Sequence, residues 1–229
     1  VPGTRRLGIL RLVRSPLAAA IDTAAPPRPG RNFRWPLASS ILTNIGDGVA
    51  LAAGPLLIAA LTRDPFLVSL GFLAQTLPKL LFGAVAGAVA DRYDRRRVIV
   101  LVNLGRAIVL AVLASTIAGG TVSIAIVLIA LFILGTAETF ADVGSSSLLP
   151  RLVPRDDLGV ANARLGSAFL LTNQLLMPPI GAFLFAVGMA LPFAVDAACF
   201  ALGALLVTRI VQGGRDEPRT GRSSLRADM

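Results

Sequence analysis

The feature that most constrains this chain is a series of six long apolar segments, each 20 to 25 residues in length. They cover residues 37–61, 66–90, 98–118, 121–141, 165–187 and 189–208. An α-helix rises about 1.5 Å per residue, so about 20 residues cross a hydrocarbon core roughly 30 Å thick. Because an unpaired backbone group is costly in lipid, segments of this kind must be helical. The sequence therefore predicts an all-α membrane protein with six transmembrane helices.

The composition indicates lipid as the surroundings and excludes several functions. Only 15% of the residues are charged, whereas a soluble domain carries about 25%. The net charge is +9, but the cations lie between apolar segments, which suits lipid phosphates and not a nucleic acid. The chain has no histidine and one cysteine, Cys199, which excludes a histidine zinc site, a Ser-His-Asp triad and an internal disulfide. We expect no enzyme activity, no cofactor, no metal site and no nucleic-acid partner.

The arginines predict how the helices are oriented. Nineteen fall in the two tails and in the loops after the second and fourth segments. Only Arg63 lies in a loop on the opposite side, and Lys79 and Arg106 lie within segments. Cytoplasmic loops of membrane proteins carry the excess of Lys and Arg. We therefore expect a multi-pass protein of the cytoplasmic (inner or plasma) membrane with both termini in the cytoplasm.

Three regions follow from this pattern. Residues 1–33 combine arginines with prolines, a composition that cannot bury a core, and are predicted to form a basic, disordered cytoplasmic tail. Residues 34–212 hold the six-helix bundle. Residues 213–229 are again polar and basic and are predicted to be a cytoplasmic linker or tail.

Charged residues within the segments are the first candidates for function, since each is costly in lipid unless it is paired or hydrated. Asp47 lies near the middle of the first segment and Asn44 shares its helical face. Lys79 lies at a comparable depth in the second segment, with Gln75 four residues before it. We expect Asp47 and Lys79 to pair. Asp47 is then either a proton-binding or substrate-contacting carboxylate, or half of an ion pair that only sets helix register.

Weaker candidates lie in the last two segments. Asn173 and Gln174, in the uncharged fifth segment, either bind a substrate or hydrogen-bond between helices. Asp196 in the sixth segment has no evident partner. Pro178 and Pro179, like Pro55 and Pro78, are expected to bend or locally break their helices.

The loop after the second segment carries the most specific motif, Gly-Ala-Val-Ala-Asp-Arg-Tyr-Asp-Arg-Arg-Arg over residues 87–97. Gly83 and Gly87 lie four residues apart and predict a face for close helix contact. Asp91 falls at the C-terminal end of its helix, where the helix dipole disfavours a negative charge. It therefore needs a cationic partner or the N-terminus of another helix.

This motif resembles the loop 2–3 motif of the major facilitator superfamily. That family usually has glycine at the position of Asp94. Residues 40–48 and 148–163 are similar to helix one and to loop 4–5 of a bacterial drug and siderophore exporter branch. The resemblance covers residues 34 to about 208, which correspond to the N-terminal six helices of a family normally built from twelve.

The resemblance implies a fold, a mechanism and roles for named residues. The fold is half of a transporter, made of two inverted three-helix repeats, that moves against a second bundle in alternating access. The loop motif (Gly87, Asp91, Arg92, Arg95 and Arg96) would hold the second bundle and control the conformational change. Arg106, Glu138 and Asp142, with Asp91 and Arg95, would form a charge network on the cytoplasmic side. Otherwise these three residues are ordinary charges at helix ends that extend to the headgroups.

The function predicted from these patterns is proton-coupled export of a small amphipathic molecule, such as a drug or siderophore. Its partners would be the lipid bilayer, protons, the small-molecule substrate and either a second six-helix half or a second copy in a homodimer. The alternative is a truncated, non-transporting membrane module that assembles with another half-transporter.

Overall fold

A computed structural model describes residues 31–209, all of which lie in helices or short connections. The predicted tails lie outside the described residues, except for 31–33, which open the first helix. The helices are α2 (Arg31–Leu61), α3 (Pro65–Arg92), α4 (Arg95–Ala118), α5 (Ile124–Leu152), α6 (Leu158–Phe169), α7 (Met177–Val187) and α8 (Leu191–Thr208). A 3-10 turn, η2 (Arg155–Asp157), precedes α6, and a π-helical segment, η3 (Leu170–Leu176), joins α6 to α7.

Six of these units are long and apolar enough to cross a membrane, and the run from Arg155 to Val187 counts as one of them. Large apolar side chains point outward from the bundle: Leu80, Leu101 and Phe183 are 85%, 67% and 67% exposed. A water-soluble protein of this size does not surround itself with apolar surface in this way. The described residues therefore confirm the predicted six-helix, multi-pass membrane fold.

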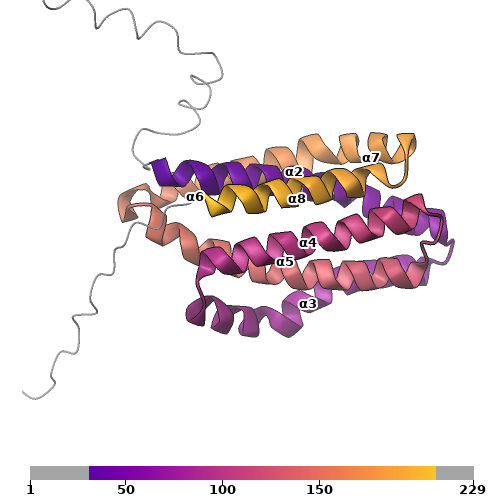
Figure 1. Ribbon diagram of the computed structural model, residues 1–229, viewed down its shortest axis with the longest axis horizontal. Helices are drawn as coiled ribbons and strands as arrows, with labels where there is room; N and C mark the ends of the chain where they lie inside the picture. Colours follow the sequence, from indigo (N-terminus) through magenta and orange to yellow (C-terminus); the bar gives the residue numbers. More distant parts are fainter. Residues whose placement is uncertain (1–30, 210–229) are drawn as a thin grey trace, which may run out of the picture.

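The helices form two groups that lie side by side in Figure 1. One group holds α2, α7 and α8, and the other holds α3, α4 and α5, with α8 packed on α4 between them. The main apolar core lies where α2, α4, α5 and α8 meet and includes Leu57, Leu110, Val127 and Phe200. By contrast, α2 and α3, although consecutive in the chain, contact each other little.

Side-chain caps and prolines begin three of the helices. Asp64 accepts a hydrogen bond from the Phe66 N–H (2.9 Å), and Pro65 occupies the first turn of α3. Asp94 accepts from the Arg96 N–H (2.9 Å), and Ser123 caps α5. Each cap satisfies a backbone donor that the first helical turn leaves free. Asp94 is therefore the N-cap of α4, and its backbone angles are ones that any residue can adopt. This explains why an aspartate can stand at a position where the family usually has glycine.

The predicted end of the fourth segment at residue 141 is wrong, because α5 continues to Leu152. The extension holds Gly144 and three serines at 145–147, so it is less apolar than the rest of the helix. Hydropathy alone therefore ended the segment too early. As a result, Glu138 lies at the middle of α5 and not near its end.

The fifth segment contains a π-helical stretch, η3. The Met177 N–H bonds to the carbonyl of Thr172, five residues back, which is the π-helical pattern. Pro178 and Pro179 have no N–H to donate to the carbonyls of the preceding turn, and this accounts for the change from α-helical to π-helical hydrogen bonding before them. By contrast, the helices remain α-helical through Pro55 and Pro78.

Candidate functional site

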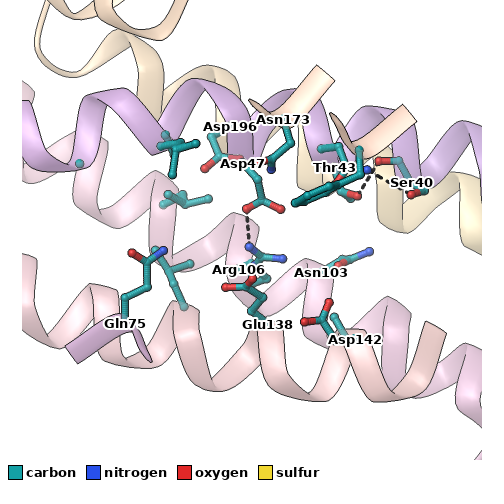
Figure 2. Close-up of a pocket in the computed structure, with 18 of the residues that line it drawn as sticks. Ser40, Thr43, Asp47, Gln75, Asn103, Arg106, Glu138, Asp142, Asn173 and Asp196 are labelled. Atoms are coloured by element: carbon teal, nitrogen blue, oxygen red, sulfur yellow. Dashed lines mark hydrogen bonds and ion pairs between the residues drawn. The ribbon is translucent and has the colours of Figure 1, made fainter. Parts of the chain in front are cut away.

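A cavity of about 750 Å³ lies within the bundle and is lined by α2, α3, α4, α5, α8 and the α6–η3 run. Each helix contributes residues three or four apart, so a single face of each helix lines the cavity. On α2 these include Ser40, Asn44 and Asp47, and on α5 Glu138 and Asp142. The close-up in Figure 2 shows Asp47, Glu138 and Asp142 directed into one space. The cavity therefore combines several charges with an apolar wall.

The central contact is an ion pair between Asp47 on α2 and Arg106 on α4. The Arg106 Nη2 donates to Asp47 Oδ1 at 2.5 Å, and the Arg106 side chain is only 7% exposed. The guanidinium also lies 3.8 Å from the ring centroid of Phe200 on α8, a cation–π contact. The expected pair of Asp47 with Lys79 is therefore wrong. The helix α3 hardly touches α2, and α4 supplies the cation instead.

Lys79 pairs with Glu138, so the second ion pair joins α3 to α5. Its Nζ lies 3.0 Å from Glu138 Oε1, and the two side chains are 47% and 30% exposed. Asp142 follows one turn later on α5 and lines the same cavity. Both ion pairs therefore belong to one cavity in the middle of the bundle.

This arrangement changes the predicted charge network. Arg106, Glu138 and Asp142 were expected in a network on the cytoplasmic side with Asp91 and Arg95, and all three line the cavity. Glu138 lies at the middle of α5 because α5 is longer than hydropathy indicated. Arg106 points to the cavity, where it pairs with Asp47. The side chain of Asp91 lies outside the described residues.

The arginine-rich loop is joined to the C-terminal end of α8 by Arg96. Arg92 ends α3 and is exposed. The Arg96 Nε donates to the carbonyl of Val207 at 3.1 Å, and its Nη2 to that of Thr208. Arg96 thus satisfies carbonyls at the C-terminal end of α8, where the helix dipole also favours a cation. Arg95, another residue of the predicted motif, is the first residue of α4.

The predicted contact face at Gly83 and Gly87 is not used in the part of the chain that the structure describes. Nothing lies within 4 Å of the place where a Cβ would stand on either residue. Close helix contacts occur elsewhere: Gly135 lies against the backbone of Gln75, and Gly181 against that of Val49. A four-residue glycine spacing indicates which helix face carries small residues. Whether that face makes a close contact depends on the position of the neighbouring helix.

The four predicted amide side chains line the cavity. Asn44 donates to Ser40 Oγ at 3.2 Å, within α2. Gln174 donates to Asn173 Oδ1 at 2.8 Å, within the π-helical segment. Both of these hydrogen bonds are local, and all four amide side chains line the cavity. Gln75 lies on α3, one turn before Lys79.

Sequence reasoning missed Asn103 and Ser145 as cavity residues. Asn103 is 4% exposed and lies one turn before Arg106, so its spacing from that arginine could have indicated it. Ser145 was placed in a loop, because the fourth segment was ended too early. Among the described residues, no three His, Cys, Asp or Glu side chains gather as metal ligands would.

Comparison with known proteins decides the family. Residues 37–228 match the Major Facilitator Superfamily. The chain belongs to that superfamily. An uncharacterized MFS-type transporter of Mycobacterium tuberculosis is 32% identical over 180 residues, which cover 75% of this chain and 41% of that protein. The uncharacterized MFS-type transporter YkuC of Bacillus subtilis is 28% identical over 181 residues, covering 77% of this chain and 40% of YkuC.

This chain thus spans about 41% of the length of its curated relatives. Its six membrane-capable helices agree with half of a major facilitator fold, and the sequence-based resemblance to the superfamily is confirmed. The relatives named here are all described as MFS-type transporters.

Proposed function

We propose that this chain forms one half of a proton-coupled exporter of small amphipathic molecules, such as drugs or siderophores. The observation that carries the proposal is the cavity of about 750 Å³ with the Asp47–Arg106 pair at its centre. A cavity of this size fits a small organic ligand. Its walls combine apolar side chains, such as Leu51 and Phe72, with the charged and amide groups described above. An amphipathic molecule matches such a lining.

Asp47 is the proposed proton-binding residue. It is the charged residue of α2 that lines the cavity, and its carboxylate is 29% exposed there. Protonation of Asp47 would release Arg106, whose buried charge would then need another partner. Proton binding at this position would therefore change the contacts among α2, α4 and α8, as coupling to transport requires.

A complete carrier needs a second bundle, supplied by further residues of a longer polypeptide, by another chain or by a second copy. Alternating access would be a rocking of the two bundles around the shared cavity. In Figure 1 the α3–α4 turn and the C-terminal end of α8 lie at the same end of the bundle. Because arginines gather at this end, we propose that it faces the cytoplasm, together with both termini.

Gly87, Asp91, Arg92, Arg95 and Arg96 are the proposed elements that control the conformational change, as the family resemblance implies. The substitution Asp91→Ala is expected to lower the maximal transport rate more than it changes substrate affinity. Initial rates across a range of substrate concentrations measure both quantities. A changed dissociation constant with an unchanged maximal rate would contradict this role.

The proposal is tested by flux in sealed proteoliposomes. The purified chain, with any six-helix partner that crosslinks to it in the membrane, is reconstituted with an imposed pH gradient. Ethidium serves as a small amphipathic fluorescent probe. We expect ethidium movement that requires the gradient, and none in Asp47→Asn, although this variant inserts into the membrane equally well.

Asp156→Asn is the control for this test, because Asp156 is an exposed carboxylate outside the cavity. It should transport like the unsubstituted protein. If the unsubstituted protein moves no ethidium, transport is contradicted and the non-transporting membrane module is favoured. Full activity of Asp47→Asn would leave Asp47 with a packing role only.

A further inference from the structure

Asp196 on α8 is the most deeply buried carboxylate in the described part of the chain. Its side chain belongs to the cavity lining, yet the residue is only 2% exposed. Its Oδ1 is fully buried and has no hydrogen-bond partner among the described residues. A buried carboxylate oxygen without a partner is rare in folded proteins, and it calls for an explanation such as a bound proton or ligand.

The packing around Asp196 brings two other charged groups close to it. Its own helix packs on α2, α4 and α7. From α2 it faces Asp47, from α4 it faces Arg106, and α7 has no ionisable side chain. Cys199 is the one other titratable neighbour on α8. Figure 2 shows Asp47 between Asp196 and the guanidinium of Arg106.

Gly46 makes this approach possible. A Cβ at position 46 would collide with Asp196 Oδ1, so the glycine leaves room for the carboxylate against α2. One turn after Asp196, Phe200 on the same face of α8 contacts the Arg106 guanidinium. The helix α8 thus presents both a carboxylate and an aromatic ring to the region of the Asp47–Arg106 pair.

The charges in this cluster do not balance. Asp47 and Asp196 would carry two negative charges when ionised, whereas Arg106 supplies one positive charge. Arg106 is already bonded to Asp47. A second buried anion beside the first is disfavoured both by its own burial and by repulsion, and two such carboxylates hold one proton between them.

We propose that Asp196 is a second proton-binding site, which shares one proton and the Arg106 guanidinium with Asp47. In the arrangement described here Arg106 pairs with Asp47, and the proton lies on Asp196 Oδ1. In the alternative arrangement Asp196 gives its proton to water in the cavity and pairs with Arg106, while Asp47 takes up a proton from the cavity. One proton leaves and one enters, so the net charge of the cluster is unchanged.

The role of this site in transport rests on the proposed proton coupling, but its occupancy can be measured without a substrate or a gradient. The probe is the infrared carbonyl band of a protonated carboxyl group, which an ionised carboxylate lacks. The full chain is purified in detergent at neutral pH, and spectra are compared for the unsubstituted protein, Asp196→Asn, Asp47→Asn and the control Asp156→Asn.

The unsubstituted protein and Asp156→Asn should show the band, and Asp196→Asn should lack it. In Asp47→Asn we also expect the band to be lost, because Arg106 then has Asp196 as its remaining carboxylate partner and the proton is no longer needed. This variant decides the question even if Asp196→Asn does not fold. Absence of the band in the unsubstituted protein would overturn the proposal, as would its full retention in Asp196→Asn or in Asp47→Asn.

The two proposals fail in different ways. If the band behaves as expected but the reconstituted protein moves no ethidium, the proposed transport fails and the proton site stands. If gradient-driven movement occurs and Asp196→Asn keeps the band, Asp196 is not the second proton site and the proposed coupling through Asp47 stands.

Discussion

At the scale of single residues, two ion pairs connect the helices around the cavity, Asp47–Arg106 and Lys79–Glu138. Asp47, Lys79 and Arg106 are each the one charged residue of their apolar segment, so the cost of a charge in lipid made them candidates for a functional role. Which of them meet depends on how each helix is rotated and on which helices touch. Because α3 packs on α5, Lys79 forms an ion pair with Glu138. Asp47 on α2 forms its ion pair with Arg106 on α4.

The two ion pairs should differ in their effect on stability. Substitution Arg106→Gln leaves Asp47 without its cation in a site where the arginine is 7% exposed, and removal of one partner of a buried pair costs about 3 kcal/mol or more. We expect a clear decrease in the thermal unfolding midpoint in detergent. The double variant Asp47→Asn/Arg106→Gln should recover part of the loss, because no buried charge is then left unpaired.

Lys79→Gln is the matched comparison on the other pair. Lys79 is 47% exposed, and exposed pairs contribute only about 0 to 1 kcal/mol. Its unfolding midpoint should therefore stay close to that of the unsubstituted protein. Equal losses for Arg106→Gln and Lys79→Gln would show that the Asp47–Arg106 pair is not the buried centre of the bundle.

At the scale of helices, the number and type of elements followed from length and apolarity, but not their ends or their contacts. Hydropathy ended the fourth segment at residue 141, because the serines and Gly144 that follow are less apolar, although they continue the helix to Leu152. The prolines of the fifth segment indicated an irregularity, and a π-helical stretch is present just before them. The glycine contacts could not be predicted, since they depend on the neighbouring helix.

The glycine contacts lead to a prediction at this scale. Gly181 lies against the backbone of Val49, so the methyl group of Gly181→Ala would push α7 away from α2. Overpacking of this kind costs about 1 to 3 kcal/mol. The thermal unfolding midpoint in detergent should fall.

Gly83→Ala serves as the control, because nothing lies within 4 Å of its added methyl group and alanine favours a helix. Its stability should change by less than about 1 kcal/mol. A loss at Gly83→Ala as large as that at Gly181→Ala would mean that the face holding Gly83 and Gly87 is packed against something in the folded protein.

At the scale of the whole molecule, the family and the bundle could be predicted, and the substrate could not. The motif at residues 87–97 led to the superfamily, and the match over residues 37–228 confirms it. The cavity needed the three-dimensional arrangement, because it combines faces of helices that are distant in sequence. The chain spans about 41% of the length of the curated relatives it matches, so in the proposed carrier a second bundle would supply the rest of the substrate site.

The central claim is that lipid surrounds these six helices and that the arginine-rich end of the bundle lies in the cytoplasm. Cysteines placed at Thr62 and Tyr93, in loops at opposite ends, test it most directly in a Cys199→Ala background. In intact cells, a membrane-impermeant thiol reagent should label Thr62→Cys, and it should label Tyr93→Cys only after the membrane is opened. Labelling of Tyr93→Cys from outside intact cells would contradict the account.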